Sequence, residues 1–305
     1  MEIISRITEF HIEGNSAVAI GKFDGIHLGH RKILSRILDQ HQDGLKSVVF
    51  TFDPSPEEFF TGKTVPQLFT REEKRRAFEE IGIDILIEFP LTEITAATDP
   101  EDFVRRILKG QLNAAYIAAG TDVSFGYRGR GDRFLLKSMS SDLGYELELL
   151  DKVRLDGEEI SSTRVRNEVA DGNMAMVKRL LGVDYSISGI VEHGRHIGHT
   201  IGVPTVNIIP PEDKLLPPYG VYASRVIIGE ESFRGMTNIG RKPTISDKEK
   251  VGVETYIYDF DRDVYNAEIR VELRKFMRSE MKFESIDALK KQIEQDLNNA
   301  LYTES

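Results

Sequence analysis

The sequence predicts two domains of different fold class: a parallel α/β domain, then an antiparallel Greek-key β-barrel with a terminal helix. Three observations lead to this prediction. The chain has 305 residues, which is more than one hydrophobic core usually serves. Strand-like and helical patterns alternate in its first half. Beyond Gly182, short β-branched or aromatic runs follow one another. We therefore place the domains at residues 1–183 and 184–305.

Composition narrows the classes of function. The chain contains no cysteine, which excludes disulfides, thiolate metal sites and cysteine nucleophiles. Its net charge of −10 argues against broad binding to nucleic acid or to acidic membranes, because basic surface drives both. The first fifteen residues carry acids and no long apolar run, so they resemble neither a signal peptide nor a membrane span. We expect a cytoplasmic protein without a nucleic-acid or membrane partner.

The first domain is predicted from strand-like runs separated by helical patterns. Thr70 and Glu73 fit a capping box that opens one helix, and Asp99 with Pro100 fits the start of another. The apolar runs lie at 16–21, 46–52, 84–89, 114–120 and 145–150. Strands that alternate with helices predict a parallel sheet covered on both faces, with ligands at the carboxyl ends of its strands.

The second domain is predicted from short runs punctuated by glycine, proline or aspartate. These runs lie at 185–193, 220–228, 232–240, 251–260 and 267–276. The chain returns to a helical pattern only at its end, where Ile286, Leu289, Ile293 and Leu297 share an apolar stripe behind a Ser285 cap. This order favours a closed antiparallel barrel followed by one helix.

The stretch GKFDGIHLGHR leaves a predicted strand, turns through Gly21 and Gly25, and enters a helix near Gly29. Free N–H groups at a helix start form an anion site. His27 and His30 would lie on the same side of this helix, with no side chain at Gly29 to obstruct a phosphate. Imidazoles there can donate hydrogen bonds to phosphoryl oxygens as charge builds in a transition state. The alternative is two unrelated surface histidines.

This stretch resembles the HxGH signature of nucleotidyltransferases. Together with TFDPSP at 51–56 and ISSTRVR at 160–166, it resembles the bacterial bifunctional riboflavin kinase/FAD synthetase family over essentially the whole chain. The resemblance implies a Rossmann-like nucleotidyltransferase domain whose catalytic histidines are His27 and His30. It implies ATP-binding roles there for Gly21, Phe23, Asp24, Gly29, Ser161, Ser162, Thr163 and Arg166. As a bare string, SST would instead be an ordinary helix cap.

The stretch GTDVSFGYRGRGDRF is similar to the loop that precedes a flavin-binding turn in the family. The resemblance implies that Asp122 helps to hold Mg²⁺ and that Phe125 and Tyr127 stack on an isoalloxazine ring. The alternative is a solvated loop of arginine and glycine that attracts RNA.

In IGVPTVNI, strand alternation places Thr205 and Asn207 on one face. Neutral oxygens suit Mg²⁺, which keeps waters and nucleotide phosphates as its other ligands. The stretch resembles the GxPTxN signature of riboflavin kinases, which implies that Gly202 and Pro204 join these two residues in binding ATP and that Thr205 and Asn207 hold the metal. Glu254 resembles the catalytic base of the family, which accepts the proton of the ribityl hydroxyl.

Further segments match the flavin pocket of the family. They are TNIG around Asn238 and MRSEMKF, which contains Arg278 and Glu280. The resemblance thus implies a chain with ATP, riboflavin, FMN and FAD as its substrates and products and Mg²⁺ as its cofactor. One step phosphorylates riboflavin to FMN, and the other transfers AMP onto FMN and releases pyrophosphate.

The chain also departs from the family pattern. Ile197 and His199 stand where arginines are common, and Val203 stands in place of phenylalanine, which predicts weaker phosphate contacts. Ser55 stands where histidine is common. Two other functions stay open at this stage. One is an adenylyltransferase of another phosphorylated substrate with a non-catalytic barrel, and the other is a flavin-binding sensor that consumes no ATP.

Overall fold

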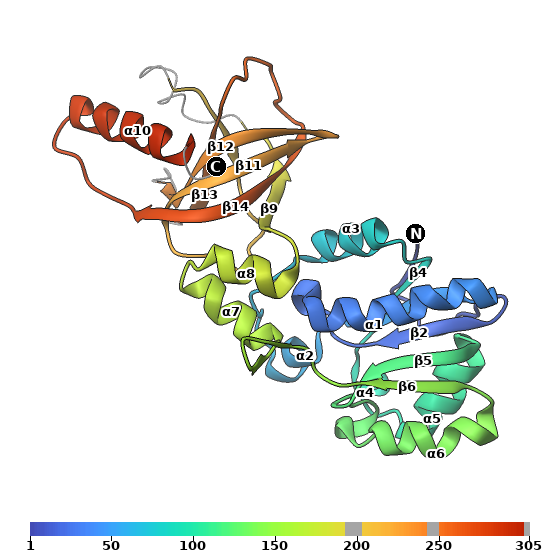
Figure 1. Cartoon of the computed structure of the whole chain (residues 1–305). Coiled ribbons are helices and arrows are strands. Elements are labelled where there is room, and N and C mark those ends of the chain that lie inside the picture. Colours follow the sequence, from blue (N-terminus) through green and yellow to red (C-terminus); the bar gives the residue numbers. More distant parts are fainter. Residues whose placement is uncertain (193–202, 243–249, 302–305) are drawn as a thin grey trace. The chain divides into compact units, whose positions relative to one another are not determined.

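The computed structural model describes residues 1–192, 203–242 and 250–301 (Figure 1). The chain forms two compact units, Met1–Ser162 and Thr163–Ser305. The second unit starts before the predicted boundary at residue 183, because helix α8 (Met174–Leu181) packs against strands of the barrel. The predicted division into functional domains at 183/184 stays a prediction.

The first unit contains a six-stranded sheet in the order β1-β4-β3-β2-β5-β6. All of its strand pairs are parallel, as predicted. The strands are β1 (Glu2–Ser5), β2 (Ser16–Ile20), β3 (Lys46–Asp53), β4 (Ile85–Pro90), β5 (Ala114–Gly120) and β6 (Glu146–Leu150). The chain leaves β2 toward β3 on one side, and β5 lies on its other side. This topological switch point is where open parallel sheets bind ligands.

Helices connect these strands (Figure 1). The capping box predicted at Thr70 and Glu73 is present, and Asp99 caps the helix that opens with Pro100. The helices are α1 (Leu28–Asp39), α2 (Pro56–Thr61), α3 (Arg71–Ile81), α4 (Glu93–Ala96), α5 (Pro100–Asp102), continued by the π-helical segment η3 (Phe103–Gln111), and α6 (Arg133–Leu143). Short elements complete the unit: η1 (Asp24–Ile26), η2 (Gln40–Asp43), η4 (Tyr127–Gly129), β7 (Arg154–Leu155) and β8 (Glu158–Glu159).

The second unit contains six antiparallel strands in the order β10-β13-β12-β11-β14-β9. An additional bridge joins the two edges, where the Glu192 amide donates to the Asn207 carbonyl over 2.8 Å. The order β14-β11-β12-β13 is that of a Greek key. The strands are β9 (Tyr185–Ile190), β10 (Thr205–Ile208), β11 (Gly220–Ile228), β12 (Glu231–Lys242), β13 (Lys250–Ile257) and β14 (Glu268–Ser279). The predicted antiparallel fold is therefore confirmed.

The two faces of this sheet differ. The buried inner face carries hydroxyls, and Thr237 bonds Ser224 at 2.8 Å and Thr255 at 2.9 Å. On the outer face, helix α10 (Ile286–Leu301) packs Ile293 and Leu297 into a cluster with β11 and β12 (Figure 1). The predicted terminal helix is present, as is α7 (Ser162–Ala170). Within the part of the chain that the structure describes, no helix has the length and apolar character needed to cross a bilayer.

Candidate active sites

The turn after β2 is tightly folded. Phe23, Gly25 and Ile26 have φ values of 49°, 77° and 43°. Left-handed backbone is costly for Phe and for β-branched Ile, so surrounding packing must maintain it. Both side chains are fully buried, and the Phe23 ring packs edge-on against His30 at 5.2 Å and Phe78 at 5.7 Å. The turn is therefore held in place before any ligand binds.

His27 and His30 lie together at the start of α1, as predicted. His27 is the N-cap, and its Nδ1 accepts a hydrogen bond from the His30 amide at 3.3 Å. The two rings stack with centroids 3.7 Å apart. A Cβ atom at Gly29 would lie 3.1 Å from the His27 ring. Glycine at this position thus leaves room for the His27 imidazole.

Both imidazoles are neutral at pH 7. Burial lowers the pKa of His27 from 6.5 to about 4, against the opposing charges of Asp24 and Asp122. Burial and the neighbouring His27 hold the pKa of His30 well below 6.5. Since His27 Nδ1 accepts a bond, its proton resides on Nε2, which can donate. His30 Nδ1 is buried without a hydrogen-bond partner among the described residues. A ligand oxygen or proton donor would satisfy it.

The ISST segment is tied to the histidine turn. Ser162, the first residue of α7, donates from its hydroxyl to the Asp24 carbonyl at 3.0 Å. The Asp24 carboxylate accepts from the Leu68 amide at 3.0 Å. Two motifs far apart in sequence therefore meet, while Thr163 and Arg166 belong to the second compact unit.

Asp122 follows β5, across the switch point from the histidines. Its carboxylate pairs with Lys152 Nζ at 3.3 Å, and its charge acts on His27. Its Oδ1 lies close to Gly120, where a Cβ atom would come within 2.8 Å of it and would displace the carboxylate. The carboxylate is exposed and belongs to the same edge of the sheet as the histidines, a position suited to a metal that also contacts phosphates.

The structure separates the two aromatic residues predicted to stack on flavin. Phe125 is 3% exposed, lies in the core and stacks on Phe103 with centroids 5.2 Å apart. Its ring also covers Gly131, where a Cβ atom would clash. Tyr127 is 39% exposed, and its amide donates to the Thr98 carbonyl at 2.7 Å. The Phe125 ring thus packs in the core and Tyr127 is accessible, and the predicted contacts of both residues with flavin stay predictions.

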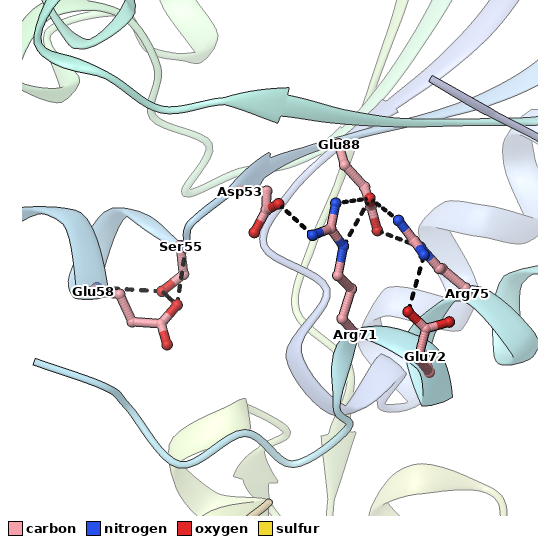
Figure 2. A network of polar contacts seen from close by, with 7 residues as sticks. All are labelled: Asp53, Ser55, Glu58, Arg71, Glu72, Arg75 and Glu88. Atoms are coloured by element: carbon pink, nitrogen blue, oxygen red, sulfur yellow. Dashed lines mark hydrogen bonds and ion pairs between the residues drawn. The ribbon is translucent and has the colours of Figure 1, made fainter. Parts of the chain in front are cut away.

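A polar network that sequence reasoning missed lies at the ends of β3 and β4 (Figure 2). The nearly buried Glu88 carboxylate accepts from Arg71 at 2.5 Å and from Arg75 at 2.6 Å. Arg71 also pairs with Asp53 at 2.9 Å, and Arg75 with Glu72 at 3.0 Å. Sequence analysis predicted only the capping box of the helix that carries both arginines. The only sequence signal was a glutamate inside the apolar run ILIEF, where a buried carboxylate needs cationic partners.

Ser55, which departs from the family pattern, has a structural role. Its hydroxyl accepts from the Glu58 amide at 3.3 Å, and its own amide donates to the Glu58 carboxylate at 3.2 Å (Figure 2). This capping box opens α2 directly after the end of β3.

The predicted residues of the barrel form one row across five strands. Asn207 pairs with Glu254, Glu254 with Asn238, Asn238 with Val221, and Val221 with Arg278. Residues directly opposite one another in antiparallel strands project to the same face. Thr205 is paired with Tyr256, two residues from Asn207 and Glu254, and so shares this face. The structure therefore brings the candidate base, amides and arginine together.

Glu280 extends this row. Its carboxylate lies against Gly240, where any Cβ atom would clash with it and would approach Asn238 Nδ2 to 3.4 Å. Pro204 is exposed and Val203 is half-buried at the start of β10. Gly202, Ile197 and His199 lie outside the described residues, so their predicted roles stay predictions.

The donors fit a magnesium ion that substrate helps to hold. No group of three or more His, Asp or Glu side chains suited to a metal occurs in the described parts of the chain. A metal would therefore depend on few protein ligands. Thr205 and Asn207 supply neutral oxygens beside the Glu254 carboxylate, and such a set suits Mg²⁺ that retains water and phosphate ligands.

Comparison with known proteins covers both units. The family described as FAD synthetase matches residues 9–164, and the family described as riboflavin kinase matches residues 181–303. The chain is 35% identical over 285 residues to the bifunctional riboflavin kinase/FMN adenylyltransferase of Listeria monocytogenes, with 92% of this chain and 90% of the relative covered. It is 36% identical over 282 residues to the protein of that name from Escherichia coli K12, with 92% and 90% covered.

One solved structure resembles the whole chain. A Streptococcus pneumoniae protein described as a macrolide-efflux protein superposes with a TM-score of 0.85. It is 30% identical in sequence, and the match covers 95% of each chain. The similarity therefore includes both the parallel sheet and the barrel.

Proposed function

The chain belongs to the family of bifunctional riboflavin kinase/FMN adenylyltransferases, and from this premise we propose which residues perform each of its two reactions. It phosphorylates riboflavin to FMN with ATP and adenylylates FMN to FAD with release of pyrophosphate. We assign adenylyl transfer to the sheet edge that carries His27 and His30. We assign phosphoryl transfer to the row that carries Asn207 and Glu254.

In the adenylyl transfer, an FMN phosphate oxygen attacks the α-phosphorus of ATP, and the bond to pyrophosphate breaks. Negative charge grows on the phosphoryl oxygens, where preorganised donors stabilise it. The observation that carries this assignment is the stacked pair of neutral histidines, which donate hydrogen bonds without the cost of burying two cations. Ser162 anchors the second phosphate-binding segment to the same turn. Tyr127 is our candidate for contact with the flavin.

In the kinase step, the terminal ribityl hydroxyl of riboflavin attacks the γ-phosphorus of ATP. Glu254 accepts the proton of that hydroxyl, and Asn238 and Asn207 on either side orient the reacting groups. Mg²⁺ held by Thr205 and Asn207 would neutralise phosphate charge when bound.

We propose a second ion at Asp122 for the adenylyl transfer. Because both reactions consume ATP, we also propose a cytoplasmic location.

A reconstitution experiment tests the overall function. The purified chain is incubated with riboflavin, ATP and Mg²⁺, and the flavins are separated by chromatography. FMN followed by FAD is the expected result. If the chain forms FMN but no FAD, it has only the kinase activity. If it forms FAD from added FMN but no FMN from riboflavin, it has only the adenylyltransferase activity. Flavin binding without ATP consumption would identify a flavin sensor.

Two variants test the assignment of sites. His27→Asn with His30→Asn should lower FAD formation from FMN by at least about 100-fold, the usual scale for losing transition-state donors, and should spare FMN formation. Glu254→Gln keeps the shape of the side chain but cannot accept a proton, so kinase turnover should fall while FAD formation persists. Equal losses of both activities in a folded variant would refute separate sites.

A further inference from the structure

The C-terminal helix carries a buried charge at the edge of the kinase row. Asp296 is 3% exposed and lies on the side of α10 that faces the barrel, among Ile293, Leu297 and Ala300. A carboxylate in such an apolar contact is costly unless it is paired and hydrogen-bonded. Replacing both members of a buried ion pair with well-packed apolar side chains is often neutral or stabilising, so such a pair is weak evidence for stability. The pair therefore points to a role in orienting Arg278.

The partner of Asp296 is Arg278, the β14 end of the row. The Arg278 Nε lies 3.1 and 3.0 Å from the two oxygens of Asp296, and Nη2 lies 2.6 Å from one of them. Gln292, one turn earlier on α10, donates to the same carboxylate at 3.0 Å. Because two nitrogens of the planar Arg278 guanidinium bind the same carboxylate, the guanidinium is held in one orientation. An ion pair through a single nitrogen would leave it free to rotate.

The clamped guanidinium also fixes the backbone that leads to Glu280. Arg278 Nη1 donates to the Ser279 carbonyl at 2.9 Å. Directly after Ser279, the Glu280 carboxylate lies against Gly240 and beside Asn238. An arginine has five N–H donors, and these bonds among described residues use three of them. The remaining two are available to a bound oxygen.

We propose that Asp296 is a positioning residue of the kinase reaction, which orients Arg278 and the Glu280 segment toward riboflavin. Asp296 itself touches no substrate and acts through the Arg278 guanidinium. The inference rests on the proposed assignment of phosphoryl transfer to the Asn207–Glu254–Asn238 row. It predicts that loss of the Asp296 charge changes the KM for riboflavin more than the KM for ATP.

The test is steady-state kinetics of the full-length chain with Asp296→Asn. This change keeps the shape of the side chain and one acceptor oxygen, but it removes the negative charge that holds the Arg278 guanidinium. We expect the KM for riboflavin to rise about tenfold, about 1.4 kcal/mol, with a smaller change in the KM for ATP and with FAD formation from FMN unchanged. Gln292→Leu, which leaves the ion pair in place, should shift the KM for riboflavin in the same direction by a smaller factor.

Glu272→Gln is the matched control. Glu272 is also nearly buried on β14 and pairs with Arg225 at 2.7 Å, but it lies outside the row. A general loosening of the barrel would alter the KM for riboflavin equally in both variants, and that result would overturn the proposal. FAD formation from FMN and thermal unfolding report folding in each variant. If wild-type chain makes no FMN, the assigned function fails instead.

A double-mutant cycle gives the decisive comparison. If Asp296 acts through Arg278, then Asp296→Asn should raise the riboflavin KM little further in an Arg278→Lys background. Lysine has no planar guanidinium for Asp296 to orient, so the effect of Asp296 is already lost. Additive effects would mean that the two residues act independently, and the proposal would be wrong. Asp296→Glu, which keeps the charge, should recover part of the lost affinity.

Discussion

The imidazole rings of His27 and His30 stack 3.7 Å apart with an interplanar angle of 15°, while the His27 ring also caps the helix that carries both. Two protonated rings could not share this position without strong repulsion. The geometry therefore agrees with the lowered pKa values of both imidazoles. It also gives the proposed adenylyltransferase site a defined response to acid.

The first prediction concerns the titration of His27. Its pKa of about 4 in the folded chain lies below the ordinary 6.5, so the imidazole should stay neutral from pH 8 down to about pH 5. NMR of the ring Cε1–H signal, assigned with His27→Asn, measures the midpoint. Asp122→Asn should lower the midpoint further, because the Asp122 charge raises it. A midpoint near 6.5 in the wild-type chain would contradict the buried, neutral pair.

The second prediction is the effect of this shift on stability. Between pH 6.5 and about 4, an unfolded His27 binds a proton that the folded one rejects. The free energy of unfolding should therefore be highest above pH 6.5 and should decline as pH falls toward 4. In His27→Gln the decline should be shallower, which denaturant titrations of the two chains at a series of pH values can establish. Parallel pH curves would rule out this linkage.

The sequence predicted those helices and strands whose pattern is contained in residues next to one another along the chain. The parallel strands, the capping box at Thr70 and the helix start predicted near Gly29 follow from spacing and cap chemistry, which are properties of neighbouring residues. Strand β1 was not predicted, because its exposed EIIS sequence becomes a strand only through pairing with β4. The barrel row was predicted in part, since alternation places Thr205 and Asn207 on one face.

Other features depended on contacts that no local pattern contains. The family resemblance implied a flavin contact for Phe125, and no local pattern indicated that the chain folds this ring over Gly131 and onto Phe103. Sequence analysis assigned no role to Asp296. Only the packing of α10 on β11 and β12 turns it toward Arg278. Residues held by partners distant in sequence are thus the ones that sequence reasoning missed.

The third prediction concerns Glu88 and its two arginines (Figure 2). Burial opposes ionisation of Glu88, but the bonds from Arg75 and Arg71 hold its pKa below the ordinary value. Glu88→Gln leaves both guanidinium groups without their shared charge and should destabilise the chain by about 2–4 kcal/mol, since one partner of a nearly buried pair is lost. Chemical denaturation at pH 7 measures the loss.

The matched control is Glu72→Gln, which removes an exposed partner of Arg75. Its cost should stay within about 1 kcal/mol, as for other surface ion pairs. Because the folded pKa of Glu88 is depressed, the difference between wild type and Glu88→Gln should be full above pH 4.5 and should shrink in acid. A pH-independent difference would point to packing rather than charge.

The fourth prediction concerns the limits of the kinase unit. Helix α8 lies before residue 184, yet its Val177, Leu180 and Leu181 side chains are fully buried, and Lys178 pairs with Asp184 at 3.2 Å. Each buried aliphatic side chain contributes about 1.5–3 kcal/mol. A fragment of residues 163–305 should therefore unfold at a clearly higher temperature than one of residues 184–305. Both contain the row of residues to which we assign phosphoryl transfer, so both should make FMN where they remain folded. Equal melting temperatures would show that α8 is dispensable.

The last prediction concerns the Mg²⁺ ion that we propose at the barrel row. Asn207 lies directly opposite Glu254, and Thr205 lies two residues away on the same face. If both side-chain oxygens hold Mg²⁺ against ATP, Thr205→Val should raise the Mg²⁺ concentration for half-maximal FMN formation by at least about tenfold. Valine keeps the β-branched shape that suits a strand, so the fold should persist.

Thr255→Val is the control: it deletes a hydroxyl from the neighbouring strand on the opposite face, and its Mg²⁺ response should match wild type. Asn207→Asp adds a charged ligand and should shift the response toward lower Mg²⁺. Titrating Mg²⁺ in all three variants while recording FMN and FAD separately decides the matter, because an unchanged response in Thr205→Val and Asn207→Asp would leave these residues without a metal.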